Sequence, residues 1–203
     1  MYSGNLGLAH SFESIFQAAT ELQIGHPQIC FVFVGDGPRL SDLLEDTRRR
    51  SLGNVRFLPP QPLEMLGTTL SAADVHIATM QENLKGLVVP SKVYGILAAG
   101  KPCIFLGPNN NEVAQLIHET ETGRVLCGPN SSQLASILSD WSTRSAEFNE
   151  ISKRAQRLAG EFGLGKALKD FTLLFEALLH RGLVTPADLP VLAAQQRPTS
   201  TAI

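Results

Sequence analysis

The residues "QICFVFVG" (28–35) and "GPRLSDLLEDTRRRS" (37–51) decide the fold, because they set an apolar strand directly before an amphipathic helix. The first run is rich in β-branched and aromatic residues, which is typical of a buried strand. In the second run, Pro38 suits the first turn of a helix. A continuous apolar strand followed by a helix is the repeating unit of a parallel, doubly wound sheet.

The same alternation continues on both sides of this unit. Upstream, "MYSGNLG" (1–7) is typical of the end of a strand followed by a glycine-rich turn. Downstream, we predict strands at 54–60, 74–80, 102–107 and 123–127, helices at 61–72, 91–100, 111–120 and 131–141, and a helical stretch over 144–182. At least five βα units in a row predict an α/β fold, a doubly wound parallel sheet with C-terminal helices. Such sheets bind ligands at the carboxyl ends of their strands.

A chain of 203 residues is long enough for one such domain. We assign residues 1–183 to it and residues 184–203 to a flexible tail, because the composition there loses its helical and strand patterns. Since the chain opens on what resembles the end of a strand, we expect it to be the second half of a longer protein.

Composition narrows the class of protein. The formal net charge of −2 argues against non-specific nucleic-acid binding, which needs a basic surface. No run approaches the roughly 20 apolar residues of a membrane span, and no signal-peptide pattern is present. The three cysteines are scattered, which suits a reducing compartment, and Cys30 and Cys103 lie in apolar runs where we expect them to be buried. These features predict a cytoplasmic location.

The helix predicted at 91–100, within "PSKVYGILAAG" (90–100), contains two unfavourable residues. If Ser91 caps the helix, Lys92 lies in its first turn and opposes the helix dipole, although free N–H groups there attract phosphate. A bound phosphate would make the lysine a ligand; the alternative is a lysine that points to solvent. Gly95 shares this face and costs about 1 kcal/mol relative to alanine, which indicates close packing on the sheet or a close ligand.

Two glycine-rich turns are candidates for backbone contact with a ligand. In "YSGNLGLAH" (2–10), Gly4 and Gly7 allow close approach, and Asn5 can donate from its amide. The pattern is neither GxGxxG nor a Walker A sequence, so the signal is weak. In "VGDGP" (34–38), Gly35 and Gly37 suit the same role, with an ordinary strand-to-helix turn as the alternative.

Two further side chains have a functional and a plain interpretation. His10 could contact a phosphate or a donor hydroxyl, or be a surface histidine. Glu112 starts a predicted helix, where it stabilises the dipole or holds sugar hydroxyls. The other histidines have no metal-ligand spacing, and no nucleophile elbow is present, so we expect neither metal nor cofactor.

Four segments together resemble the C-terminal donor-binding domain of GT-B glycosyltransferases of family 4. They are "YSGNLGLAHSF" (2–12), "FVFVGDGP" (31–38), the region from "NVRFLPPQP" (54–62) to "LSAADVHIA" (70–78), and "GLVVPSKVYGILAAGKPCIF" (86–105). The chain is most similar to the WbuB-like and WcaI-like bacterial polysaccharide glycosyltransferases, over residues 1 to about 180. The resemblance implies the Rossmann-like half of a GT-B fold, retention of anomeric configuration and no metal.

The resemblance also implies roles for particular residues. The Gly4–Asn5 turn and the Ser91–Lys92 helix start would hold the donor diphosphate. The segment 57–59, with Leu58 at its centre, would lie against the base, while Tyr94 and Glu112 would border the ribose or the sugar.

The sequence departs from the family pattern at two places. Many members carry two glutamates separated by seven residues, and the corresponding positions here are Leu87 and Gly95. The first-loop arginine and lysine that grip the diphosphate in many members are also missing, and Asn5 and His10 stand nearby instead. Glu112 is the candidate replacement for the missing carboxylates.

The function implied is transfer of a sugar from a nucleotide donor, with a UDP-sugar as the expected donor, to a polysaccharide or lipid-linked acceptor. An acceptor domain, absent from this sequence, would act in cis or in trans. We expect this chain alone to be inactive, and the full-length protein to be at most peripheral to the inner membrane. Two alternatives stay open: a non-catalytic nucleotide-sugar-binding or partner module, and a UDP-sugar epimerase-like enzyme.

Overall fold

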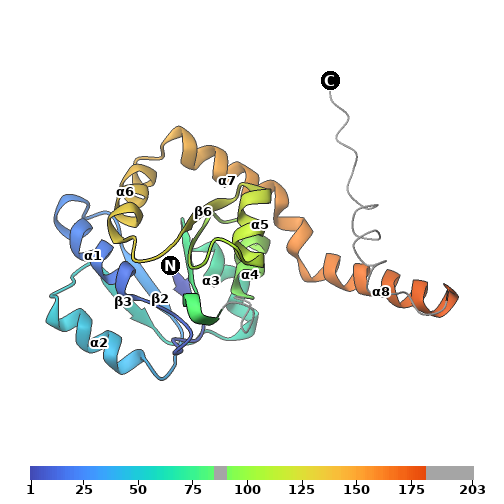
Figure 1. Cartoon of the computed structure of the whole chain (residues 1–203), viewed down its shortest axis with the longest axis horizontal. Coiled ribbons are helices and arrows are strands. Elements are labelled where there is room, and N and C mark those ends of the chain that lie inside the picture. The colour runs from blue at the N-terminus through green and yellow to red at the C-terminus, as the bar shows by residue number, and fades with distance from the viewer. Residues whose placement is uncertain (85–90, 182–203) are drawn as a thin grey trace. The chain divides into compact units, whose positions relative to one another are not determined.

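The computed structural model describes residues 1–84 and 91–181 (Figure 1). The chain divides into two compact units, Met1–Phe162 and Gly163–Ile203. The first unit holds all the strands found in the described residues, and it is the unit that carries the candidate site. None of the described helices is long and apolar enough to cross a membrane.

Six short parallel strands form the centre of the first unit. They are β1 (Tyr2–Ser3), β2 (Phe31–Val34), β3 (Val55–Leu58), β4 (His76–Thr79), β5 (Cys103–Leu106) and β6 (Gly123–Leu126). They pair as two three-stranded sheets, β1-β2-β3 and β4-β5-β6. The sheets meet where the Ile77 amide donates to the Met1 carbonyl at 2.8 Å. Across this junction the order is 3-2-1-4-5-6, and the point where it reverses, between β1 and β4, is where doubly wound sheets hold ligands.

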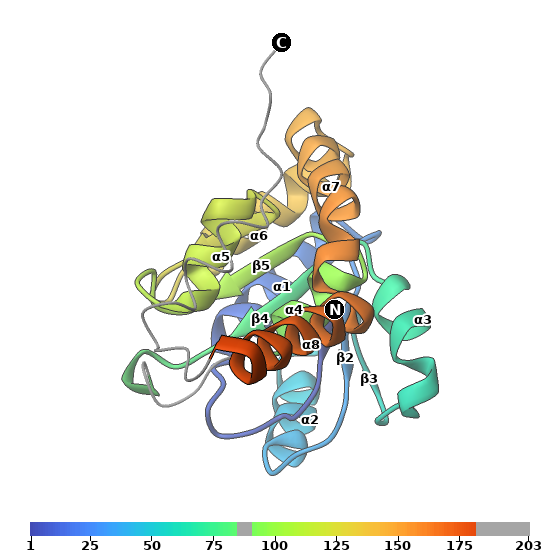
Figure 2. The same ribbon diagram turned by 90° about the vertical axis from the view of Figure 1, so that its right-hand side faces the viewer.

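Helices cover both faces of the sheets, as the sequence predicts. They are α1 (Glu13–Gly25), α2 (Leu40–Arg49), α3 (Leu66–Ser71), α4 (Lys92–Ala98), α5 (Glu112–Thr120), α6 (Ser131–Ser142) and α7 (Ala146–Leu158), with the 3-10 turns η1 (Leu63–Met65), η2 (Glu82–Leu84) and η3 (Ala159–Phe162). Helices α1 and α6 pack against each other, and α4 packs against β4 and β5 (Figure 2). The predicted doubly wound α/β fold is therefore confirmed.

Alternate residues of β5 build two different hydrophobic clusters. Ile104 and Leu106 join one cluster with residues of α1 and α6, whereas Cys103 and Phe105 join the other with residues of α4 and α5. This follows from the period of two in a strand, whose successive side chains point to opposite faces. Burial on both faces explains why the strands are continuous apolar runs, and each fully buried large side chain contributes about 1.5–3 kcal/mol.

Three expectations differ from the structure. Cys30 is exposed, because β2 begins only at Phe31; Cys103 is buried as expected, and burial raises its pKa to about 12. The helix expected at 61–72 is the turn η1 followed by the short α3. The stretch expected over 144–182 is divided into α7, η3 and α8 (Leu164–Arg181), with Gly160 and Gly163 near the breaks.

The second unit is described only through α8. Lys166 pairs with Asp170 one turn later, at 2.6 Å between Nζ and Oδ2. Leu168, Phe171 and Phe175 are exposed. The tail expected at 184–203 lies outside the described residues, and the domain boundary at 183 stays a prediction.

Candidate functional site

Some of the predicted site residues, the glycine turn after β1 and Lys92, lie together at the junction of the two sheets. The turn after β1 is fastened to the end of β4 by three hydrogen bonds. The Gln81 amide donates to the Ala9 carbonyl at 3.0 Å, and its side-chain Nε2 donates to the Leu8 carbonyl at 2.7 Å. His10 Nδ1 donates to the Thr79 carbonyl at 2.7 Å. The glycine-rich turn therefore has a fixed place over the point where the strand order reverses.

The second glycine turn packs against the first. Gly4, Gly35 and Gly37 have φ of 126°, 143° and 156°, a region that favours glycine. A Cβ atom on Gly35 would overlap the Gly4 carbonyl, and one on Gly37 would lie 2.5 Å from Asn5 Oδ1. The close approach that both glycines permit is therefore an approach of one turn to the other. A contact between these glycines and a donor stays a prediction.

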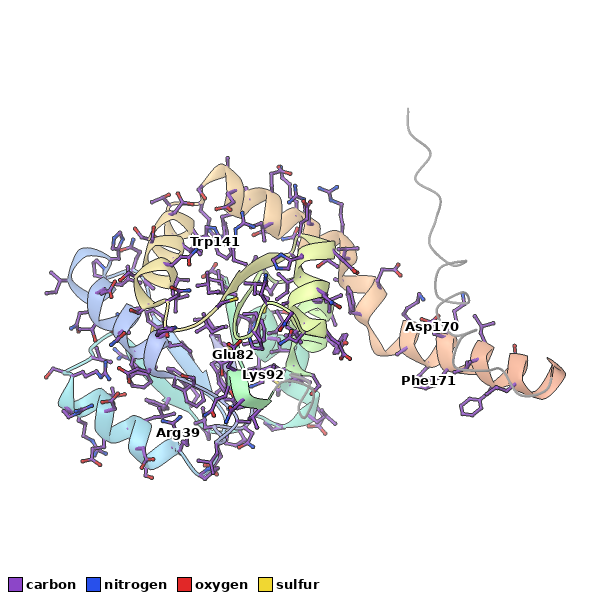
Figure 3. All side chains as sticks on the ribbon, viewed as in Figure 1. Arg39, Glu82, Lys92, Trp141, Asp170 and Phe171 are labelled. Carbon is purple, nitrogen blue, oxygen red and sulfur yellow. The ribbon has the colours of Figure 1, made fainter. Side chains whose placement is uncertain are left out.

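Lys92 does not point to solvent but turns inward to the first glycine turn (Figure 3). Its Nζ donates to the Tyr2 hydroxyl at 2.5 Å and lies 3.8 Å from the centroid of that ring. Nζ also lies 3.7 Å from where a Cβ atom of Gly4 would be. Burial lowers the pKa of Lys92 to about 8, while the Cys103 thiol acts in the opposite direction. Within residues 1–84 and 91–181, no carboxylate pairs with this ammonium.

Tyr2 links the lysine to the turn. Its hydroxyl accepts from Lys92 and donates to the Asn5 carbonyl at 2.7 Å. The side chain is 2% exposed, and its ring packs edge-on against Phe12 with centroids 5.0 Å apart. Burial raises the pKa of Tyr2, so the hydroxyl stays protonated. No sequence pattern indicates this role, because a tyrosine in a buried strand is typical of a core residue.

His10 is buried, so its interpretation as a surface histidine is wrong. Since a carbonyl can only accept, the bond to Thr79 places a proton on Nδ1. The neutral ring then carries its acceptor on Nε2. Burial lowers the pKa of His10, and the nearby Lys92 charge lowers it further.

The helix start that follows β4 differs from the expectation in one respect. Ser91 occupies the N-cap position of α4, but its side chain makes no capping hydrogen bond. A Cβ atom on Gly95 would lie 3.4 Å from Leu70 Cδ1, so this side of α4 packs against α3 rather than on the sheet.

The remaining predicted residues lie on β3, α4 and α5. Leu58 ends β3, is 47% exposed, and its carbonyl accepts from the Gly35 amide at 3.0 Å. Tyr94 is exposed on α4, its ring 6.4 Å from that of Phe162. Glu112 is exposed at the start of α5. In the described part of the chain, no hydrogen bond or ion pair joins Tyr94 or Glu112 side chains to the other predicted residues.

Arg39 was missed by the sequence analysis. It precedes α2, and its Nη1 donates to the His10 carbonyl at 3.1 Å, with the guanidinium 5.5 Å from the Phe12 ring centroid. A second cation therefore borders the first glycine turn. The only sequence signal was an arginine directly after "VGDGP". No group of three or more His, Cys, Asp or Glu side chains that could hold a metal occurs in residues 1–84 and 91–181.

Comparison with known proteins identifies the family of the chain. Residues 1–142 match the family described as Glycosyl transferases group 1. The chain is 30% identical over 129 residues to WbjE of Pseudomonas aeruginosa, described as a glycosyltransferase, covering 64% of this chain and 32% of that protein. It is 31% identical over 127 residues to WcaI of Escherichia coli, described as a colanic acid biosynthesis glycosyl transferase, covering 63% of this chain and 30% of that protein.

A similar fold occurs in HepE of Anabaena, solved in complex with UDP. The TM-score is 0.66 at 17% identity, over 87% of this chain and 48% of that one. The aligned part thus spans about a third of the two curated relatives and about half of the solved structure. The family match and the similar fold lead to one conclusion: the chain belongs to the group 1 glycosyl transferases and carries the Rossmann-like, C-terminal half of a GT-B fold.

Proposed function

We propose that this chain binds the nucleotide part of a sugar donor at the carboxyl ends of β1 and β4. The observation that carries the proposal is Lys92, a partly buried ammonium held against the Gly4 turn without a carboxylate partner in the described residues. A desolvated cation is unfavourable unless an anion completes its surroundings. A diphosphate fits, because Lys92 supplies positive charge and the glycine turn allows a close backbone approach.

The other predicted residues would bind the rest of the donor. Leu58, exposed at the end of β3, would lie against the base. Tyr94 and Glu112 would border the ribose or the sugar. Uridine is our choice of base, and UDP in the HepE structure supports it. Ser91 makes no capping hydrogen bond to α4, so both its backbone amide and its hydroxyl would be available to the diphosphate.

Transfer itself would require more than this chain. As the bond from the sugar to the diphosphate breaks, charge grows on the phosphate oxygens, and Lys92 would stabilise it without a metal. The acceptor hydroxyl must be held close to the anomeric carbon, and we propose that a second domain, in cis or in trans, does this. We therefore propose a retaining glycosyltransferase whose donor half is this chain. A lipid-linked acceptor, and with it a peripheral association with the inner membrane, belongs to the same proposal.

Calorimetric titration of UDP, UDP-GlcNAc and GDP into the 203-residue chain tests the proposal. Lys92→Met keeps the length of the side chain and removes the charge, and Lys153→Met, which removes an exposed charge on α7, is the matched control. We expect UDP to bind more tightly than GDP. Lys92→Met should lower the UDP affinity roughly tenfold or more, and Lys153→Met should leave it unchanged.

Other outcomes have clear meanings. Equal UDP affinity in wild type and Lys92→Met would reject the diphosphate role of Lys92. The non-catalytic module would be favoured if the chain binds UDP and forms a stable complex with an acceptor-domain protein, but no assembly of the two transfers sugar. Interconversion of UDP-sugars by this chain alone would favour the epimerase-like alternative.

A further inference from the structure

The Tyr2 hydroxyl is the point at which two parts of the proposed donor site are joined. On one side it accepts a hydrogen bond from Lys92 Nζ at 2.5 Å, across the junction of the sheets. On the other it donates to the Asn5 carbonyl at 2.7 Å, in the glycine turn. One oxygen atom thus connects the cation of α4 to the backbone that follows β1.

Packing alone does not account for this hydroxyl. The ring of Tyr2 lies among His10, Phe12 and Phe33, with centroid distances of 5.7, 5.0 and 6.0 Å. Phenylalanine would fill the same space with no polar atom to satisfy. A buried hydroxyl is favourable only where it has partners, and both partners here belong to the proposed donor site.

We propose that Tyr2 is a positioning residue for the donor, whose hydroxyl holds the Lys92 ammonium beside the Gly4–Asn5 turn so that both meet the same diphosphate. The inference rests on the proposed function. A lysine side chain has four rotatable carbon–carbon bonds, and fixing it before the ligand arrives removes part of the entropy lost on binding. The cation–π contact with the same ring restrains the ammonium further.

Three titratable groups, on three elements, interact with the ammonium, two of them through charge alone. Tyr2 lies on β1, the Cys103 thiol on β5, and the His10 imidazole in the turn after β1. Only the tyrosine hydroxyl is within hydrogen-bonding distance among the described residues. Removing the Tyr2 hydroxyl should therefore change the position of the Lys92 ammonium and leave its other neighbours unchanged.

Tyr2→Phe is the variant that tests this. It keeps the ring, its aromatic neighbours and the cation–π contact, and it removes one oxygen atom. We expect UDP affinity at pH 7 to fall roughly three- to tenfold, the range for ordering one flexible side chain on binding. Thr47→Val, which removes the hydroxyl that donates to the Leu43 carbonyl in α2, is the matched control and should leave the affinity unchanged.

The pH dependence of UDP affinity separates positioning from a general loosening of the site. Lys92 must be protonated to attract the diphosphate, and its pKa is about 8, so wild-type affinity should fall as pH rises through that value. Loss of the hydroxyl acceptor disfavours the charged form, so the midpoint should move to lower pH in Tyr2→Phe. A loosened, more hydrated site would move it upward, towards the ordinary value of lysine. The phosphate and His10 titrate below a window of pH 7.0 to 9.5.

Each result gives a decision. Weaker UDP binding with a lower midpoint supports the positioning role. If Tyr2→Phe matches wild type in affinity and midpoint while Lys92→Met still binds weakly, the inference is wrong and the proposed function stands. An upward or unchanged midpoint with weaker binding also overturns it, since Tyr2 would then serve packing. If Lys92→Met binds like wild type, the proposed function itself fails.

Discussion

Three single residues near β4 carry ionisable groups in apolar surroundings: Lys92 and His10 beside its C-terminal end and His76 at its start. Lys92 has a hydroxyl, an aromatic ring and a glycine turn as neighbours, and His10 and His76 are both buried. Burial lowers the pKa of all three groups. Lys92 and His10 lie beside the proposed donor site. His76 lies at the opposite end of β4, and its ring bonds to the Leu70 carbonyl, away from that site. The two kinds of burial predict different measurable effects.

His76 should make the folded state sensitive to mild acid. It is 0% exposed, Nε2 donates to the Leu70 carbonyl at 2.8 Å, and burial lowers its pKa to about 4. Between pH 6.5 and 4 the unfolded chain binds a proton that the folded chain does not, so the free energy of unfolding falls as pH falls. The loss should approach about 3 kcal/mol.

Urea unfolding at several pH values between 4.5 and 7.5 measures this slope. His76→Gln retains a side-chain donor but does not titrate, so its free energy of unfolding should depend less steeply on pH. His118→Gln, at an exposed histidine of α5, should keep it. An unchanged slope in His76→Gln would assign the acid sensitivity to other groups.

The site residues that could be predicted from the sequence are those that are locally unfavourable or that allow an unusual backbone conformation. A lysine in a first helical turn and glycines after strands were visible in the sequence, and the structure brings Gly4 and Lys92 together. Tyr2 and Arg39 were missed, because their roles depend on partners 90 and 29 positions away along the chain. Cys30 was misjudged because an apolar run does not show at which residue its strand begins.

At the scale of elements, two glycines predicted to have similar roles should respond oppositely to alanine. Gly35 directly follows β2 with φ of 143°, and a Cβ atom would overlap the Gly4 carbonyl, so Gly35→Ala should destabilise the fold by about 2 kcal/mol or more. Gly95 lies inside α4, with only Leu70 Cδ1 3.4 Å from a new Cβ atom. Gly95→Ala should therefore stabilise the protein by roughly 0.5–1 kcal/mol.

Thermal or urea unfolding of both variants, with UDP titration of Gly95→Ala, checks these effects. Unchanged UDP affinity is expected for Gly95→Ala, because the glycine contacts α3. If Gly95→Ala is stable but no longer binds UDP, Gly95 would instead be a position at which the ligand comes close to α4.

Element positions followed from apolar runs, and the errors have local causes. Every predicted strand contains an observed strand, because the apolar runs are too short for a typical helix and alternate with longer amphipathic segments. The helix at 61–72 was overestimated at its start, because Pro62 is extended, with φ of −55° and ψ of 149°, and the turn η1 follows it, so that α3 begins only at Leu66. A helical pattern likewise continued through Gly160 and Gly163, where the chain divides.

At the scale of the molecule, the first unit has its own core. Both hydrophobic clusters of the described residues lie within Met1–Phe162. A chain ending at Phe162 should therefore fold alone, with a cooperative thermal transition close to that of the full chain and the same UDP affinity. Circular dichroism melting and calorimetry check this. A non-cooperative transition would show that residues after 162 are needed for the core.

The junction between the two sheets has a mechanical consequence. β1 is only two residues long, and of the bonds that cross to β4, the Ile77-to-Met1 bond lies at one end and the Gln81-to-Ala9 bond at the other. In the described residues the two sheets therefore share few backbone hydrogen bonds at this junction, and the Lys92–Tyr2 hydrogen bond adds a side-chain link across it. A diphosphate bound by both Lys92 and the Gly4 turn would add a further link between the two sheets. Ligand binding would therefore also make the whole sheet more rigid.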